Sequence, residues 1–399
     1  MKKMENKQVN APNIDTELQM MNQELNERLD INGAENSSSE RKKLHIHEKK
    51  DRGKRRKFAG WVILGVFLLL IVGSVVTVFG LRWSGKQSLT GHEAVEDVEI
   101  TAPDTVEVQE EGMLVSYNGK KYRRNEDIIT ILCMGIDRED LETEGIVTGE
   151  SGQADTVFVV ALDSSSGGVK LLNISRDSMI DVDLYNVNDE YVETSKMQLC
   201  LAYAYGDGKE SSCENMKKSV SRLLYGMPID AYAAIDLPAI NVLNDAIGGV
   251  EVEVLEDLTL MDPALKQGAT VLLQGNQAEN YVRSREVEGE DAPIDSNNAR
   301  MARQKQYLTN FIKKALEATK EDLTVPLTLY QAATSYMITD IGASEVTYLA
   351  SLVLQGGFNA ENIISIPGEV TLVDTHAQYH VDEAALYEII LDVFYEEVE

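Results

Sequence analysis

The sequence predicts an α/β protein, a three-layer α/β/α sandwich with a central mixed sheet, preceded by one transmembrane helix. Three observations lead to this prediction. An uncharged apolar run occupies residues 58–81. Strand-like runs after residue 127 are apolar along their whole length, which is typical of a sheet covered on both faces. Helical patterns separate and follow these runs, and a chain of 399 residues with 43% hydrophobic residues can bury a large core.

The N-terminal part predicts a membrane anchor. Residues 1–57 are rich in Asn, Gln, Glu and Ser and are expected to form a disordered basic tail. The run at 58–81 has the roughly 20 apolar residues that a membrane-crossing helix needs, and its distance from the N-terminus indicates an uncleaved signal anchor. The basic segment from Arg41 to Lys57 precedes it, so the positive-inside rule places the tail in the cytoplasm and the C-terminal domain outside the cell membrane. The alternative use of such a segment is nucleic-acid binding.

The folded domain is predicted to begin at Asp127, after an extracytoplasmic stalk at residues 82–126. It is expected to comprise residues 127–320 and a C-terminal α/β extension at 321–399. β-branched and aliphatic residues predict strands at 128–134, 156–162, 169–175 and 249–254. Capping and periodicity signals predict helices at about 211–226, 236–249 and 296–320, and then a helix, a strand and a helix beyond residue 344.

All three cysteines fall in the predicted domain. Cys133 lies in an apolar strand and is expected to be a small buried residue. Cys200 and Cys213 lie on two successive predicted helices, close enough for a disulfide in an oxidising compartment. The sequence leaves open whether this disulfide forms, because three cysteines do not make a framework.

Polar side chains stand at the ends of three predicted strands. Asp137 follows the first strand, Asp155 precedes the second, and Arg176 and Asp177 follow the third. If the second strand runs antiparallel to the other two, these side chains meet at one edge of the sheet. Asp137 and Asp155 would then suit Mg²⁺, or Mn²⁺ in its place, since Mg²⁺ takes one or two carboxylates with phosphate oxygens and water. The alternative is that strand ends are polar only because they reach solvent.

A second group of cations lies further along the chain. In an extended backbone Arg283 and Arg285 would point to the same side. On the helix that follows, Arg300, Arg303 and Gln304 share a face. Because arginine contacts phosphate through two parallel hydrogen bonds, these residues predict a pyrophosphate site.

Charge limits the possible ligands. The neighbouring acids Glu286, Glu288 and Glu290 offer the arginines an alternative role as surface ion pairs. The formal net charge of −29 opposes unspecific binding to anionic polymers, because like charges repel at long range. No nucleic-acid partner is therefore expected, and an anionic ligand would need a specific pocket.

These motifs resemble the LytR-CpsA-Psr family of bacterial cell-envelope proteins. The resemblance extends from about Asp127 to Leu316 and rests on six segments in the family's order: "ILCMGIDRED", "QADTVFVVALD", "VKLLNISRDSMIDV", "LCLAYAYGDG", "LLYGMPIDAYAAIDLPAINVLNDAIGGVEVEV" and "YVRSRE…ARMARQKQYL". It implies an α/β/α domain with an apolar pocket for a polyprenyl chain. The implied activity is transfer of an anionic glycopolymer, such as teichoic acid or capsular polysaccharide, from an undecaprenyl-pyrophosphate carrier to peptidoglycan.

The resemblance also assigns roles to residues. Asp137 and Asp155 are similar to magnesium-associated aspartates, and Gln304 is similar to a glutamine that follows the last arginine of the site. The pyrophosphate-binding arginines that it implies are Arg176, Arg283, Arg285, Arg300 and Arg303. We expect Arg176 to act in catalysis and Asp155 or Asp177 to accept the acceptor's proton. The apolar helices around Leu223 and Val242 are candidates for the lipid pocket.

The chain departs from the family pattern at Arg138 and Glu139, at Gln153, at the segment 198–200 and at Asn297. Two other functions therefore stay open. One is a lipid-pyrophosphate hydrolase that uses water as the nucleophile. The other is a non-catalytic envelope regulator of the transcriptional-attenuator type, which binds lipid-linked intermediates without turnover.

Overall fold

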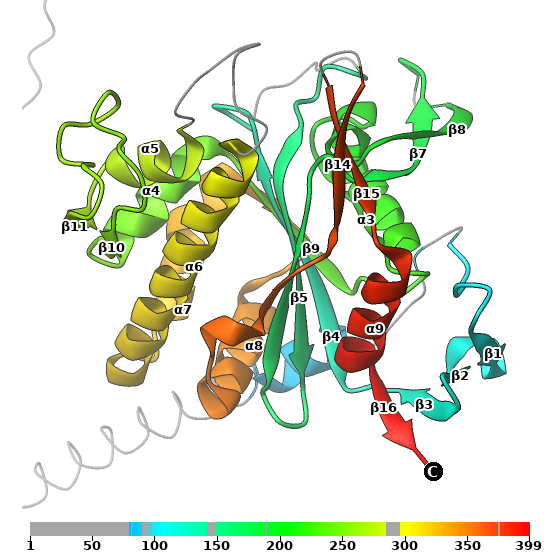
Figure 1. The fold of residues 1–399 in the computed structure, drawn as a ribbon. Coiled ribbons are helices and arrows are strands. Elements are labelled where there is room, and N and C mark those ends of the chain that lie inside the picture. The colour runs from blue at the N-terminus through cyan, green and yellow to red at the C-terminus, as the bar shows by residue number, and fades with distance from the viewer. Residues whose placement is uncertain are drawn as a thin grey trace, which may run out of the picture. The chain divides into compact units, whose positions relative to one another are not determined.

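Six strands form a central mixed sheet in the order β12-β9-β4-β5-β6-β13 (Figure 1). β5 is antiparallel to both β4 and β6, whereas β9 is parallel to β4 and β13 is parallel to β6. The three strands predicted between residues 128 and 175 are confirmed, and the second meets the condition for their polar ends to share one edge, because it is antiparallel to both others. The strands are β4 (Ile128–Ile136), β5 (Ala154–Asp163), β6 (Val169–Ile174), β9 (Ala231–Ile235), β12 (Met337–Thr339) and β13 (Ile363–Ser365).

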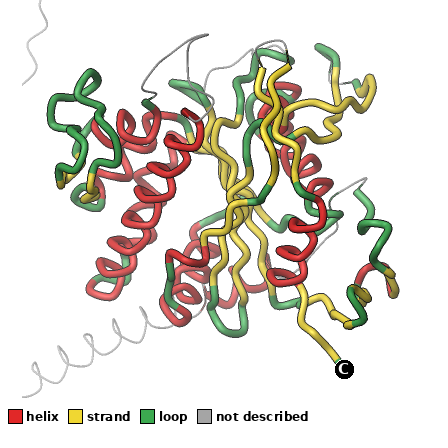
Figure 2. The backbone as a smooth tube through the Cα atoms, viewed as in Figure 1, coloured by secondary structure: helices red, strands yellow, loops and turns green. Residues whose placement is uncertain are grey.

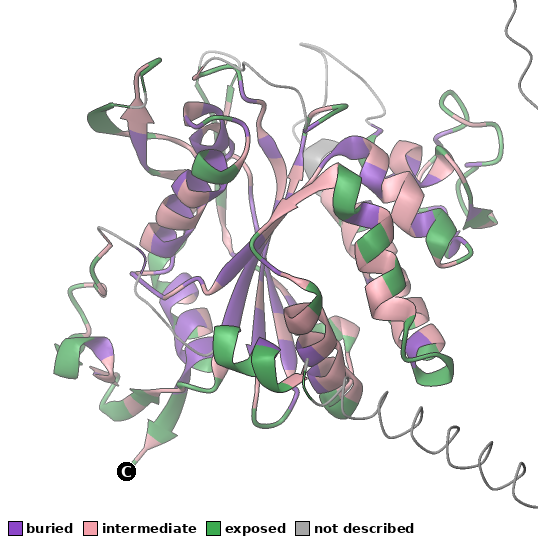
Figure 3. Cartoon of the chain, turned by 180° about the vertical axis from the view of Figure 1, so that it is seen from behind, coloured by how far each residue is buried: buried purple, intermediate pink, exposed green. Residues whose placement is uncertain are grey.

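Helices cover both faces of this sheet, as the continuous apolar strands predicted (Figure 2). Alternate residues of β4 enter different cores: Leu132 packs with one helical layer, and Ile131 packs with the other. Figure 3 shows burial concentrated in the strands and on the helix faces turned toward them. The first layer contains α3 (Glu210–Leu223) and α9 (Glu383–Phe394); the second contains α6 (Ser296–Glu321), α7 (Val325–Ala333) and α8 (Ala343–Gly356).

Around the central sheet, the described part of the chain forms three two-stranded sheets. β10 (Val250–Glu253) and β11 (Thr270–Leu273) form one of them, which shares a core with α5 (Gln277–Arg283) and contacts α6. α4 (Leu237–Ala246) lies beside α5. The other two sheets are hairpins that contact each other: β7 (Met179–Tyr185) with β8 (Tyr191–Gln198), and β14 (Gly368–Val373) with β15 (His376–Val381).

The structure is a computed structural model that describes residues 80, 82–89, 95, 98–141, 148–188, 190–284, 296–373 and 376–399. The predicted cytoplasmic tail lies outside these ranges. So does the predicted span at 58–81, apart from Gly80. Among the helices of the described ranges, none is both long and apolar enough to cross a membrane.

The folded domain begins before Asp127, which corrects the predicted stalk. β1 (Glu107–Gln109), β2 (Leu114–Tyr117) and β3 (Lys120–Arg124) form a sheet with the C-terminal β16 (Tyr395–Val398). Val115 is buried in the same core as α9. Their polar sequence does not predict these strands, because β1 and β3 lie at the surface and expose most of their side chains.

Candidate functional site

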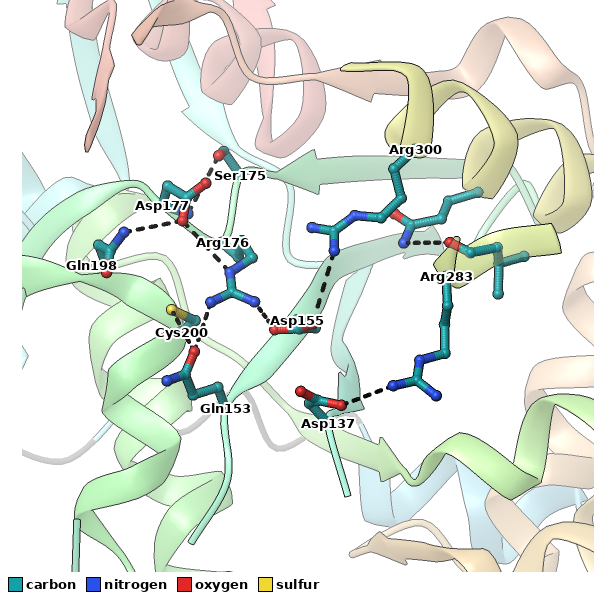
Figure 4. A network of polar contacts seen from close by, with 12 residues as sticks. Asp137, Gln153, Asp155, Ser175, Arg176, Asp177, Gln198, Cys200, Arg283 and Arg300 are labelled. Carbon is teal, nitrogen blue, oxygen red and sulfur yellow. Dashed lines mark hydrogen bonds and ion pairs between the residues drawn. The ribbon is translucent and has the colours of Figure 1, made fainter. Parts of the chain in front are cut away.

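Asp137 and Asp155 lie side by side at one edge of the central sheet. Ile136 pairs with Ala154 and Gly135 pairs with Thr156, so Asp155 is the additional residue of a β-bulge. A bulge turns a side chain that strict alternation would send to the opposite face. Asp155 therefore points to the same face as Thr156, and both residues line one cavity with Asp137. Figure 4 shows Asp137 and Asp155 with the arginines that contact them.

Arg176 is held by three residues at this edge. Its Nη1 pairs with Asp155 Oδ1, and its Nη2 donates to Gln153 Oε1 at 2.6 Å. Its Nε lies 3.5 Å from Asp177 Oδ1. Every nitrogen of the guanidinium has a partner, so the plane of the group is fixed before any ligand arrives. Gln153 was noted in the sequence only as a departure from the family pattern, and its contact with Arg176 could not be foreseen.

Two arginines from the helical layer complete the charged cluster. Arg300 on α6 has its Nη1 3.9 Å from Asp155 Oδ2, and its side chain is only 7% exposed. Arg283 is the last residue of α5. Its Nη2 lies 3.3 Å from Asp137 Oδ1, and its Nη1 lies 2.7 Å from Glu279 Oε1. The structure thus brings together Arg176, Arg283 and Arg300 with the two aspartates, as predicted. The predicted extended backbone at Arg283 is wrong, since this residue is helical.

The cluster lines a cavity of about 760 Å³ between the sheet and α6. The lining changes from charged to apolar along α6, from Arg300 and Gln304 through Tyr307 to Ile312. At 1.5 Å per helical residue, this path is about 18 Å long. β5 shows the same order, since Asp155 is followed along the cavity by Phe158 and Val160. The cavity therefore suits a ligand with an anionic end and a long apolar part.

Small side chains on the sheet make room for the cavity. Cys133, Gly135 and Ala233 lie on its floor, and Cys133 is the direct neighbour of Ala233 across β4 and β9. The prediction that the helix around Leu223 lines the lipid pocket is wrong, because Leu223 packs in the core on the other face of the sheet from the cavity. Val242 does not line the cavity, although Leu237 and Ile240 of the same helix do. Strand alternation could have suggested these wall residues once the helical layer was known, but a single sequence does not show which face is covered by which helix.

Arg303 was predicted to bind phosphate, and the structure corrects this prediction. Its side chain is 1% exposed and is absent from the cavity lining. It pairs with Glu256 and donates from Nε to the carbonyl oxygen of Tyr281 at 2.7 Å and from Nη2 to that of Ser284. Burial lowers its pKa to about 10. Arg303 therefore holds the end of α5, next to Arg283, and does not face a ligand.

Asp177 is also displaced from its predicted place. It does not line the cavity and lies on the far side of Arg176, where it accepts a hydrogen bond from Gln198 Nε2 at 3.1 Å (Figure 4). A direct role in proton transfer is thus unsupported by its position. Arg285 lies outside the described residues, and so does the side chain of Asn297.

The carboxylates fit magnesium only in a restricted sense. Within the described ranges, no three His, Cys, Asp or Glu side chains gather as a metal site would require. Asp137 and Asp155 are each paired with a guanidinium. Protein-bound Mg²⁺ commonly combines one or two carboxylates with water and substrate phosphates. The donor set therefore fits an ion shared with a phosphorylated ligand better than an ion held by the protein alone.

The cysteines form no disulfide. All three are free thiols, so the bond considered between Cys200 and Cys213 is absent. Both of these residues are fully buried, whereas Cys133 is partly accessible because it faces the cavity. Burial raises the pKa of the Cys133 thiol to about 11, so the thiol is neutral near pH 7 and acts as an apolar wall group.

Asp236 is a cavity-lining carboxylate that the sequence analysis did not select as a site residue. It is 2% exposed and caps α4 by accepting from the Ala239 N–H at 3.1 Å. Burial raises its pKa from 3.8 to about 6, and Asp140 and Glu139 contribute in the same direction. Folding thus favours the protonated form of this group.

Replacement of Asp236 by Asn should change how stability depends on pH. Because the folded pKa is raised, the stabilisation from protonated Asp236 is complete below about pH 4 and is lost as pH rises through about 6. Asn keeps the cap and stays neutral. We expect Asp236→Asn to match the wild type at pH 4 and to exceed it by up to about 3 kcal/mol at pH 7.5. Urea unfolding at pH 4 and pH 7.5 measures the free energy of unfolding of both proteins. The same difference between variant and wild type at both pH values would contradict the raised pKa of Asp236.

Known proteins are similar to this chain in sequence. The sequence model of the LytR_cpsA_psr family matches residues 85–391. The chain is 26% identical over 286 residues to TagV of Bacillus subtilis (strain 168), a polyisoprenyl-teichoic acid–peptidoglycan teichoic acid transferase, covering 68% of this chain and 66% of TagV. It is 23% identical over 326 residues to the transferase TagU of Enterococcus faecalis, covering 82% of this chain and 92% of TagU.

Solved structures share the fold. The crystal structure of B. subtilis TagV matches with a TM-score of 0.50 at 22% identity, covering 67% of this chain and 96% of that one. Protein gbs0355 from Streptococcus agalactiae matches with a TM-score of 0.52 at 21% identity, covering 67% of this chain and 86% of that one. At these identities the likeness concerns the fold alone.

Proposed function

This chain belongs to the LytR_cpsA_psr family, and from this premise we propose that it transfers a lipid-linked anionic glycopolymer, such as teichoic acid or capsular polysaccharide, to peptidoglycan. The observation that carries the proposal is the cavity, whose lining changes from three guanidiniums to apolar side chains over about 18 Å of α6. A polyprenyl pyrophosphate carrier has the matching chemistry, with a dianionic or more highly charged head and a long hydrocarbon tail. Curated relatives are named as teichoic acid transferases.

The guanidiniums would hold the pyrophosphate. Arg176 is fixed in its plane by Gln153, Asp155 and Asp177. Arg300 approaches from α6, and Arg283 lies at the more exposed rim. Such preorganised cations stabilise the charge that develops on phosphate oxygens and leaving group. Gln304, whose amide donates to the carbonyl oxygen of Val282 at 3.3 Å, lines the cavity beside them.

The proposed reaction is a displacement at phosphorus. A sugar hydroxyl of peptidoglycan attacks the phosphorus that carries the glycopolymer, an O–P bond forms, and the P–O bond to the polyprenyl phosphate breaks. The hydroxyl proton passes to a cavity carboxylate. Asp155 meets this requirement, because phosphate oxygens would compete for its two arginines and leave one of its carboxylate oxygens able to accept the proton. Mg²⁺, or Mn²⁺ in its place, would be held by Asp137 and Asp155 and would neutralise part of the pyrophosphate charge.

We also propose that the chain is a single-pass membrane protein, anchored by residues 58–81 with the domain outside. The support is the uncharged run and the basic segment before it. This placement would bring the domain to a lipid substrate at the membrane surface.

Product analysis tests the activity. The purified protein is incubated with a polyprenyl-pyrophosphate-linked glycopolymer, with and without peptidoglycan oligomers. We expect a covalent polymer–peptidoglycan product and polyprenyl phosphate only when the acceptor is present. Release of free polymer in the absence of acceptor would instead favour the hydrolase. Tight binding without any product would favour the non-catalytic regulator.

A further inference from the structure

Arg176 is linked to the β14–β15 hairpin through two side chains. Gln198 Nε2 donates to Asp177 Oδ1 at 3.1 Å, and this same oxygen lies 3.5 Å from Arg176 Nε. Gln198 Nε2 also donates to the carbonyl oxygen of Ala377, on β15, at 2.7 Å. Figure 4 shows Gln198, Asp177, Arg176 and Asp155 following one another in this order. The contacts join the outer hairpin to the charged end of the cavity.

The main chain supports the same junction. The Tyr379 N–H donates to the carbonyl oxygen of Asp177 at 2.8 Å, and Tyr379 forms an isolated β-bridge with Ser178. The Cys200 N–H donates to the carbonyl oxygen of Arg176 at 3.0 Å. The turn that carries Arg176 and Asp177 is therefore held from two directions, by β15 and by the segment that follows Gln198.

The chemistry of Gln198 is specific to an amide. A primary amide nitrogen carries two hydrogens, and both partners of Nε2, a carboxylate and a carbonyl, can only accept. The carboxamide can satisfy both acceptors at once, whereas a carboxylate of the same shape would repel both. Gln198 thus fixes Asp177 Oδ1, and this oxygen in turn limits rotation of the guanidinium at Nε.

We propose that Gln198 is a positioning residue for phosphate transfer, which orients Arg176 through Asp177 and couples this orientation to the β14–β15 hairpin. This inference rests on the proposed function to the extent that Arg176 contacts phosphate. Gln198 itself does not line the cavity. Loss of the amide would leave Arg176 bound to Asp155 and Gln153 but free to tilt at Nε. Such misplacement lowers the rate of a displacement reaction more than it weakens substrate binding.

The isosteric substitution Gln198→Glu gives the sharpest test. We expect kcat for transfer to fall at least ~10-fold at pH 8 with a smaller change in KM. Part of the loss should be recovered toward pH 5, where a proton shared between the introduced carboxylate and Asp177 restores one donor. Gln198→Met, which keeps the volume and removes both donors, should show the lower kcat without the recovery at low pH. If the substitutions only destabilised the fold, Gln198→Glu and Gln198→Met would not differ in the recovery of kcat at low pH.

Asn362→Ala is the matched control, because its amide also donates to a backbone carbonyl, that of Val169, at 2.8 Å, and neither Asn362 nor Val169 lines the cavity. It should leave kcat unchanged. The Nε–Hε resonance of Arg176, measured by NMR without substrate, provides a second readout: it should shift in both Gln198 variants and stay in place in the control. Unchanged kcat with an unchanged resonance would overturn the positioning role. An absence of transfer in the wild type with a shifted resonance would instead reject the proposed function.

Discussion

Replacing Arg176 by Ala is expected to lower the rate of glycopolymer transfer by ~10²–10³-fold, the effect typical of removing one preorganised donor that stabilises transition-state charge. Arg176 is the central cation of the cluster, because it touches Gln153, Asp155 and Asp177 and lines the cavity. Arg176→Lys should give an intermediate loss, since it keeps the charge but not the planar group. Steady-state transfer assays and binding of a polyprenyl pyrophosphate measure these effects.

The control for this experiment is Arg123→Ala. Arg123 lies on β3, is half exposed and pairs with Glu110, so its removal takes away one positive charge without touching the cavity. We expect wild-type transfer from this variant. Thermal unfolding of all variants separates loss of catalysis from loss of structure, because removing Arg176 also leaves two partly buried carboxylates without this partner. Undiminished transfer by a folded Arg176→Ala variant would remove the guanidinium from the mechanism.

Filling the floor of the cavity is expected to weaken lipid binding roughly 100-fold while the fold persists. Cys133 and Ala233 are adjacent small residues on β4 and β9, and both face the cavity. Phenylalanine at both positions would occupy space that the hydrocarbon chain needs. Loss of contact with about four CH₂ groups corresponds to about 3 kcal/mol, or roughly 100-fold in affinity. The unfolding temperature should stay the same or rise, since an empty apolar space is filled.

Val187→Phe is the control for the filled cavity. Val187 is 71% exposed in the β7–β8 hairpin, so the added ring remains in solvent. Lipid affinity in detergent, measured with a fluorescent polyprenyl phosphate, should be unchanged in this variant. If the double variant with Cys133→Phe and Ala233→Phe bound the lipid as tightly as the wild type, the apolar length of the cavity would not be the lipid site.

The position of Asp137, Asp155 and Arg176 at one edge of the sheet could be predicted, because it follows from the order and direction of three strands. An antiparallel strand between two others brings the end of the first, the start of the second and the end of the third to one edge. The covered sheet was predictable for a similar reason, since continuous apolar strands require cover on both faces. Both inferences depend on local sequence patterns with a fixed geometric consequence.

Other features depend on contacts between distant segments and could not be predicted in this way. The bulge that orients Asp155 leaves no mark in the sequence. Tyr281 and Val282 favour a strand by propensity, yet packing of Tyr281 in the core beside β10 makes the segment helical. Helical periodicity correctly predicts that Arg300 and Arg303 lie on neighbouring turns of one helix. It does not show that Arg300 lines the cavity while Arg303 is buried against the end of α5.

The most direct test of the proposed site is mass spectrometry of lipid bound to the protein purified from membranes of an expressing bacterium. Native spectra, followed by extraction, should show a polyprenyl phosphate or pyrophosphate with the wild type, less of it with Arg176→Ala, and far less than in the wild type with the double variant that carries Cys133→Phe and Ala233→Phe. The same amount of polyprenyl lipid on the filled-cavity variant as on the wild type, or none on the folded wild type, would contradict a polyprenyl-pyrophosphate site in this cavity.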